Sequence, residues 1–504
     1  MIVETEERDG YTGSREEAMS KEKGKHRTFR VIAGLLAVLA LAILALVLFV
    51  DIGKYRPGLE TEASRILGLD VKIRGEMKIE YFPPFGVSLG DIHGARRGAT
   101  VFRVERMRAG LKILPLLWGR VRVRQVELFR PQLSLLRTGS GPFDFERYLA
   151  RPFRMTREAL PGTFDSVDRF SVSGGIISYE SRDSSTRAEV DGLELVMRDI
   201  TFGEPPVEDL FRAVSLSGNV KAARAAVGSW EASNVAFELT AKNGNFEIHP
   251  ITLQAFGGTG EGSLWINLSV LTPLVNIRFS QTGSDIGQLF TAAGGKRGLL
   301  AGNADLSWNL FMKGGEPDAL GKTMTGDISW KGSDLTVRDF NPDALLSSTG
   351  KGKSAPLARM GALLLPGPLF SAAAEGLFGP DARKEKGEEE GRVDTLVSYW
   401  TVKNGRFEAE DVALATKGHR VALTGGIDLT AGQFDNVTVA LVDDRGCARA
   451  GQTVQGAFRH PRITEAITAK GKEPAGETPA GETRETAPGG ECKVFYAGTV
   501  PPPQ

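Results

Sequence analysis

Apolar and polar residues alternate with a period of two along most of the chain, and this pattern predicts β-strands. Valine and arginine alternate strictly in residues 120–124. The run 235–241 places Val, Phe, Leu and Ala on one face, with Glu238 and Thr240 on the other. A sheet made of such strands is apolar on one side. That side must close on itself, pack against helices or hold an apolar ligand.

A one-residue shift of the pattern predicts a β-bulge. Val126 and Leu128 resume the alternation out of phase with Val121 and Val123. An extra residue in one strand of a pair produces such a shift. We therefore expect the strand to bend between Val123 and Val126.

Turn signals separate the alternating runs. Asn243-Gly244 and Asn404-Gly405 each stand between two runs, and Asn-Gly favours a tight hairpin because both residues accept positive φ. Gly257-Gly258, Gly425-Gly426 and Ala431-Gly432 are also expected to be turns. The spacing predicts strands of five or six residues in a meandering antiparallel sheet. Roughly thirty such strands in one uninterrupted ribbon would span about 140 Å.

A continuous apolar run near the start predicts one transmembrane helix. Val31–Val50 carries neither a charge nor a proline, and its length as a helix matches the hydrocarbon thickness of a bilayer. Basic residues dominate the preceding ten positions, so the positive-inside bias places the N-terminus in the cytoplasm and everything after Asp51 outside it. The alternative is a cleaved signal peptide with Ala40-Leu41-Ala42 as its cleavage site.

Helices are expected in only two other places. Leu59–Leu67 fits a short helix that ends at Gly68 as its C-cap. Ala355–Phe378 is apolar, but Pro366 and Pro368 interrupt it and charged residues make a second membrane span unfavourable. A short helix pair that packs on the sheet or at a membrane surface fits this segment better.

These patterns divide the chain into seven parts. The expected order is a disordered cytoplasmic tail (1–28), a transmembrane signal-anchor helix (29–50), an N-terminal β region (51–150), a middle β region (151–342), short helices with a charged low-complexity insert (343–392), a C-terminal β-sheet (393–465), and a disordered linker with a cysteine-bearing terminal strand (466–504). The expected fold class is therefore mainly β, with a long, curved, groove-like antiparallel sheet that follows one membrane helix.

Composition excludes several classes of function. Lys+Arg and Asp+Glu both number 62 in 504 residues, so there is no overall basic field to hold nucleic acid. The five histidines are scattered, with neither an HExxH motif nor clustered acidic partners, and no GxSxG or CxxC motif occurs. Gly352-Lys353-Ser354 resembles the end of a phosphate loop, but position 347 is serine where that pattern needs glycine. We expect no catalytic residue, metal site or cofactor.

The two cysteines are expected to pair. Cys447 and Cys492 both lie after the membrane segment, in what should be an oxidising compartment, and no other thiol competes. We predict a disulfide that fixes the C-terminal segment to the sheet; the alternative is two free thiols.

The chain also resembles the AsmA family of envelope proteins in two blocks. The first block consists of Gly68–Val71, Arg74-Gly75, Tyr81–Pro83, Val87–Ile92, Leu111–Gly119, Val126–Pro131 and Gly141–Phe145. The order of these pieces is similar to the N-terminal region of the family, although many members have Asn-Trp where this chain has Asp144-Phe145. The second block, with Asn404-Gly405, Gly425–Leu429, Gly456–Pro461 and the two cysteine segments, resembles its closing sheet.

The resemblance implies an inner-membrane anchor, a periplasmic β-sheet curved into a groove, and a role in outer-membrane biogenesis, protein assembly there or phospholipid movement. The expected partners are the inner membrane through residues 29–50, phospholipid and other envelope proteins. Candidate groove residues are Val121, Val123, Val235, Phe237 and Leu239. A sandwich with a filled core, a scaffold that binds proteins along its sheet edges, and an envelope hydrolase with a dispersed carboxylate site are the alternatives.

Overall fold

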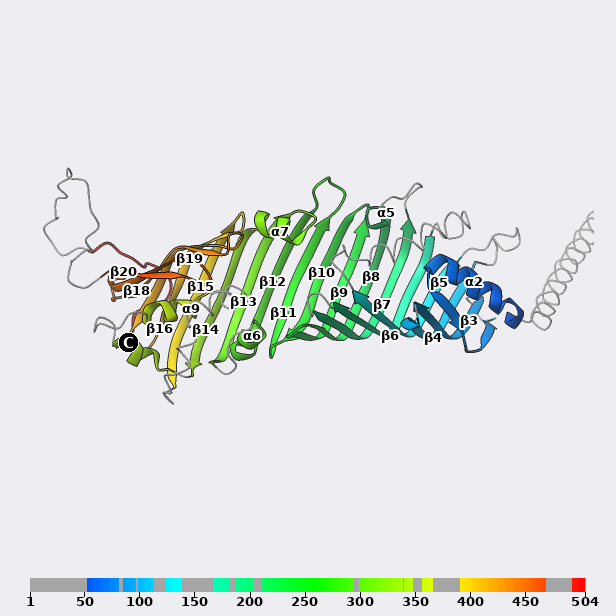
Figure 1. Ribbon diagram of the computed structural model, residues 1–504, viewed down its shortest axis with the longest axis horizontal. Coiled ribbons are helices and arrows are strands. Elements are labelled where there is room, and N and C mark those ends of the chain that lie inside the picture. Colours follow the sequence, from blue (N-terminus) through cyan, green and yellow to red (C-terminus); the bar gives the residue numbers. More distant parts are fainter. Residues whose placement is uncertain are drawn as a thin grey trace, which may run out of the picture.

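The computed structural model describes most of the chain after the apolar run. The described residues are 52–80, 85–96, 98–112, 123–137, 166–181, 186–202, 210–293, 299–338, 340–347, 356–365, 390–467 and 492–503. Within them, one sheet of 20 strands runs from the N-terminal to the C-terminal end of an elongated molecule (Figure 1).

The strands are mostly long. Their bounds are β1 Asp70–Ile73, β2 Met77–Glu80, β3 Gly86–Arg96, β4 Ala99–Leu111, β5 Val123–Arg137, β6 Ser166–Ser181, β7 Arg187–Phe202, β8 Val214–Val227, β9 Trp230–Lys242, β10 Asn245–Ala255, β11 Gly258–Asn267, β12 Leu274–Asp285, β13 Leu300–Lys313, β14 Thr325–Val337, β15 Gly391–Lys403, β16 Arg406–Ala415, β17 Arg420–Asp428, β18 Gln433–Val442, β19 Ala448–Ala457 and β20 Arg462–Ile467.

The order of strands in the sheet follows the chain. β1 and β2 both pair with β3, and from β3 to β20 each strand pairs with the next. All these pairs are antiparallel except β5–β6, which is parallel, so the expectation of an antiparallel sheet is wrong at this one step. A parallel neighbour needs a crossover connection, and residues 138–165 connect these two strands.

The helices are short. They are η1 Ile52–Tyr55, α2 Arg56–Leu67, α5 Leu210–Ala213, α6 Ile286–Ala292, α7 Pro317–Thr323, α8 Pro342–Ser347 and α9 Pro356–Ala362. The expected helix at Leu59–Leu67 is confirmed as part of α2, and Gly68 ends it in the left-handed conformation with its N–H bonded to the Ser64 carbonyl. The expected membrane helix at 29–50 lies outside the described residues. Among the helices that are described, none is long and apolar enough to cross a membrane.

The glycine signals have two different outcomes. Asn243-Gly244 and Asn404-Gly405 form the expected hairpin turns, with positive φ at all four residues. The expected turn at Gly425-Gly426 is wrong, because both glycines lie inside β17. Gly425 has a φ of +103° and the β17–β18 register shifts there, so it forms a bulge within a continuous strand. Strands joined in this way are longer and fewer than expected, and the 20 strands span on the order of 90 Å.

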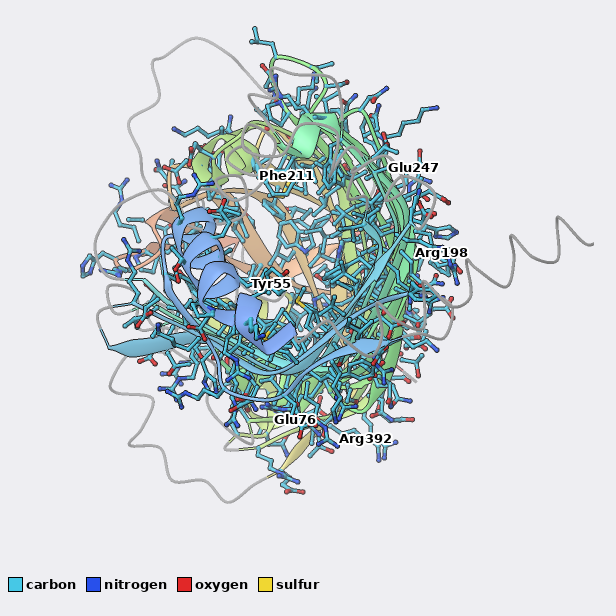
Figure 2. The ribbon with its side chains drawn as sticks, turned by 90° about the vertical axis from the view of Figure 1, so that its right-hand side faces the viewer. Tyr55, Glu76, Arg198, Phe211, Glu247 and Arg392 are labelled. Atoms are coloured by element: carbon cyan, nitrogen blue, oxygen red, sulfur yellow. A yellow bond between two sulfur atoms is a disulfide. The ribbon has the colours of Figure 1, made fainter. Side chains whose placement is uncertain are left out.

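Similar bulges bend the sheet along its length. The register between β4 and β5 shifts where the phase change predicts, since Leu111 pairs with Val123 while Gly110 pairs with Gln125. Left-handed residues inside strands accompany further irregularities; they include Asp91, Arg130, Gly174, Gly192, Asn234, Gly302 and Asp334. Because bulges increase local twist and bend, they give the sheet the curvature seen end-on in Figure 2.

The largest core fills only the C-terminal end of the curve. There, α6, α8 and α9 pack on the same side of β13–β19, and residues such as Trp400, Leu414 and Met360 are fully buried. A smaller cluster at the N-terminal end packs α2 against β1, β3 and β4. The sheet between these ends has few fully buried apolar residues.

The C-terminal segment lies on the other side of the sheet. Cys447 and Cys492 are joined by a disulfide with a Cα–Cα distance of 5.9 Å, and one β-bridge pairs Cys447 with Val494. Tyr496 and Val500 pack against alanines and valines of β15–β18. Tyr496 also donates a hydrogen bond of 2.6 Å from its hydroxyl to Asp411.

Candidate functional site

The strands carry different chemistry on the two sides of the sheet. Figure 2 looks along the molecule from its N-terminal end and shows Phe211 within the curve of the sheet, with Arg198 and Glu247 on its outside. Met197 is the residue before Arg198, and Ile248 is the residue after Glu247. Because neighbouring residues of a strand point to opposite faces, the side chains of Met197 and Ile248 lie on the concave side. We call this concave side the inner face.

One line of apolar residues, the Leu239 row, crosses the inner face from β3 to β18. Register partners on neighbouring strands have side chains on the same face, so the pairing defines the row. Its members in order are Val87, Ala109, Val126, Phe170, Met197, Gly218, Leu239, Ile248, Leu264, Ile277, Leu310, Gly326, Val402, Phe407, Ile427 and Phe434.

A second line, the Phe237 row, runs beside the first. Its members are Met77, Leu89, Met107, Leu128, Val172, Leu195, Val220, Phe237, Ile251, Gly262, Phe279, Trp308, Ile328, Trp400 and Ala409. Neither row contains a charged or polar side chain. Together they form an apolar band that runs along the molecule, across the strands.

The burial of this band changes along its length. In the Leu239 row, every member from β3 to β14 is half-buried, and Val402, Phe407, Ile427 and Phe434 on β15–β18 are buried. Trp308 and Trp400 show the same change in the Phe237 row, since Trp308 is half-buried and Trp400 is 0% exposed. The apolar band is therefore partly open to solvent from β3 to β14 and covered beyond it.

Among the residues that the structure describes, only small elements cover the open part. The short helix α5 brings Phe211 to a ring-centroid distance of 6.5 Å from Phe246. Near this contact, Val167, Ile200 and Val214 form a small cluster with their half-buried neighbours. Ala222, Ala241 and Gln281 are buried, and most other inner-face side chains of β8–β12 are half-buried.

The outer face is polar. Glu238 pairs with Asn219 across β8–β9, and Thr240 pairs with Glu247 across β9–β10. Arg224 holds Glu189 and Glu231 in ion pairs of 3.0 and 2.9 Å, and all three side chains are exposed. Surface pairs of this kind contribute little to stability. The contrast between the two faces makes the inner face the candidate site.

The structure places the predicted groove residues as follows. Val235, Phe237 and Leu239 lie on the inner face of β9 and are half-buried. Val123 lies on β5 and is buried, and Val121 lies outside the described residues. Sequence reasoning did not identify the other members of the two rows. Alternation assigns a residue to a face of its own strand, but only the register shows which residues of other strands continue the line.

A polar cleft lies at one edge of the sheet beside α6. Its volume is about 890 Å³, and its walls include Glu231, Gln254, Asp285, Gln288 and Arg338. Asp285 accepts hydrogen bonds from the backbone N–H groups of Gly287 and Gln288, so its carboxylate caps α6. This carboxylate has a structural role, and the cleft offers no continuation of the apolar band.

The carboxylates give no indication of acid–base catalysis. Several have a pKa that departs clearly from its ordinary value, and each is lowered; these are Glu62, Glu76, Asp91, Glu231, Asp343, Asp428 and Asp443. A general acid at neutral pH needs a raised pKa. Among the described residues, no group of three or more His, Cys, Asp or Glu side chains is placed to hold a metal ion.

Comparison with known proteins identifies a family for the N-terminal part of the chain. The model of the AsmA family matches residues 21–229, a range that contains β1–β8. The resemblance described from the sequence is therefore confirmed over these residues, and its second block, from Asn404 onward, lies outside the matched range. No curated protein and no solved structure matches the chain.

Proposed function

We propose that this AsmA-type chain supports outer-membrane biogenesis by holding phospholipid acyl chains on the inner face of its sheet. In this proposal residues 29–50 anchor it in the inner membrane, and the sheet lies in the periplasm. The protein needs no catalytic group for this role, since acyl chains bind by burial alone.

The apolar band supports this proposal. Two rows of apolar residues run along the molecule, and over β3–β14 every member except the buried Val172 is half-buried. Apolar surface that a protein leaves uncovered in this way marks a site for an apolar partner. Each CH₂ group that an acyl chain buries there would contribute about 0.8 kcal/mol, so a shallow face suffices to hold a chain of ordinary length.

A scaffolding role is the second candidate, and one observation favours it. β20 pairs with β19, and no further described strand pairs with its other side. An unpaired strand edge can add a strand from another protein. This edge would recruit envelope proteins without using the inner face, so the two roles predict different effects of inner-face substitutions.

Leu239→Glu tests lipid binding, with Thr240→Glu as its matched control. Both changes put a carboxylate in the C-terminal part of β9, but Leu239 lies on the inner face and Thr240 is exposed on the outer face. We expect Leu239→Glu to remove phospholipid from the purified protein, because a charge opposes acyl-chain contact. Thr240→Glu should retain the lipid. Mass spectrometry of extracted lipid and a thermal melt of each variant give the two readouts.

The thermal melts distinguish a lipid-binding role of Leu239 from a role in an ordinary filled core. Leu239 is half-buried, so Leu239→Glu should stay folded, with its carboxylate able to reach water. A wild type without lipid, beside a Leu239→Glu variant that unfolds, would contradict the lipid role and favour the scaffold.

A further inference from the structure

A short segment of the chain itself packs on the inner face at the C-terminal end of the sheet. This segment, Pro356–Leu365, contains α9 and the turn that follows it. Its apolar side chains are almost completely excluded from solvent; they are Leu357, Ala358, Met360, Ala362, Leu363, Leu364 and Leu365. α9 contacts β17, β18 and β19, so it lies across several strands of the C-terminal sheet.

The segment packs in the core that buries the C-terminal end of the band, where it approaches Ser398, Val439 and Gln452. It belongs to the same buried cluster as Val402, Phe407, Ile427 and Phe434, which are the members of the Leu239 row on β15–β18. The half-buried Leu310 and Ile328, on β13 and β14, pack against the edge of that cluster. The apolar band is thus one surface, open from β3 to β14 and filled by the chain beyond that point.

Hydrogen bonds join the segment to the strands beneath it. Gln452, on β19, accepts a hydrogen bond of 3.0 Å from the backbone N–H of Ala358. Ser398, on β15, donates a hydrogen bond of 2.6 Å to the Leu364 carbonyl and accepts one of 2.7 Å from the Trp400 indole. Gln452 and Ser398 are buried, so removal of the segment would cost each of them one hydrogen bond, although Ser398 would keep its bond from Trp400.

We propose that Pro356–Leu365 is a plug that closes the C-terminal end of the lipid-binding face. Its leucines take the place that acyl chains take on β3–β14, and the buried hydrogen bonds hold it there. Lipid therefore passes beyond β14 only when the plug leaves, and otherwise exits sideways from the open part. This proposal rests on the proposed function, because it assumes that the inner face binds lipid.

The contact between Gly361 and Val439 allows the plug to be fixed or displaced. A Cβ at position 361 would lie 3.5 Å from the Val439 Cβ, within the range that a disulfide spans. The double variant Gly361→Cys/Val439→Cys should therefore lock the plug onto β18. A Cβ at 361 would also lie 2.4 Å from the Val439 Cγ2, so the larger side chain of Gly361→Leu should push the plug off the sheet.

A photoreactive benzoylphenylalanine reports where lipid reaches. It replaces Phe279 in the open part of the band or Phe434 in the buried part, in the full-length protein in its native membrane. We expect lipid adducts at position 279 in every background. At position 434 we expect none in the locked variant and adducts in Gly361→Leu.

Each result has a distinct meaning. Adducts at position 434 in the locked variant would overturn the plug, as would their absence in a folded Gly361→Leu variant. Absence of adducts at position 279 in all backgrounds would instead overturn lipid binding itself. A thermal melt and an alkylation assay of each variant establish that it is folded and that the added cysteines are paired.

Discussion

Phe279 and Trp308 stack on the inner face, with ring centroids 4.8 Å apart and ring planes inclined by 22°. They are register partners on β12 and β13, and both are half-buried. Aromatic side chains bury large areas in cores and in interfaces. Here the stacked pair lies in the open part of the Phe237 row and forms a broad apolar surface.

Trp308→Ala should reduce lipid binding at a modest cost in stability. We expect a loss of about 1–2 kcal/mol in the free energy of unfolding, because Trp308 keeps part of its surface in water. Trp400→Ala, in the same row, should cost about 3–5 kcal/mol, because Trp400 is fully buried and bonded to Ser398. Urea denaturation measures both losses, and an equal loss at the two positions would show that the band is closed throughout.

The disulfide should hold the C-terminal segment against the outer face. Cys447 and Cys492 are 45 residues apart, and closure of such a loop stabilises by about 4 kcal/mol in the chain-entropy model. The variant Cys447→Ser/Cys492→Ser should lose most of this and release Tyr496 and Val500 from the sheet. Alkylation of the unreduced, denatured wild type should label no thiol, and two labelled thiols per chain would contradict the pairing.

The anchoring of α8 should depend on pH. Burial raises the pKa of Asp343, but hydrogen bonds from His419, Thr416 and Gly418 outweigh it and leave the pKa lowered. A carboxyl with a lowered pKa in the folded state stabilises the protein above its unfolded-state pKa, and this is lost as pH falls through the folded value.

Asp343→Asn removes this charge and keeps its shape. The variant should be less stable than wild type at neutral pH. The difference should shrink as pH falls below about 3.9, the ordinary value for aspartate. Urea denaturation across this range measures it, and a difference that stays constant with pH would mean that the Asp343 charge has no part in holding α8.

The membrane anchor also remains a prediction. An enzyme that is active only outside the cytoplasm, fused after Gln504, should be active, and high salt should not release the chain from membranes. A soluble protein trimmed at its N-terminus would instead show that Val31–Val50 is a cleaved signal peptide.

Local signals predicted local structure well. Asn243-Gly244 makes its turn because both residues accept positive φ whatever the rest of the chain does. Gly425 also has positive φ, yet it bulges within β17 because the neighbouring strand β18 continues past it. Turn and bulge are alike at the residue itself, so the sequence of that segment cannot distinguish them.

The sequence predicted that the candidate site is an apolar face of the sheet, but it did not predict which strands that face crosses. Alternation identified Phe237 and Leu239 as apolar residues of one face, which the structure places on the inner face. The rows, however, depend on registers between strands, and the plug depends on which face Pro356–Leu365 covers. Such long-range relationships leave no mark in the pattern of any single strand. The parallel β5–β6 pair was missed for the same reason.

The pairing of each strand with its successor has a consequence for how such chains change in length. A hairpin added between two antiparallel neighbours would extend the sheet by about 10 Å and leave every other pairing intact. It would also restore the strand direction, so both ends of the molecule would keep their orientation. Removal of a hairpin would shorten the sheet in the same way. This architecture can therefore be lengthened or shortened by whole-hairpin insertions and deletions, with the strands at both ends unchanged.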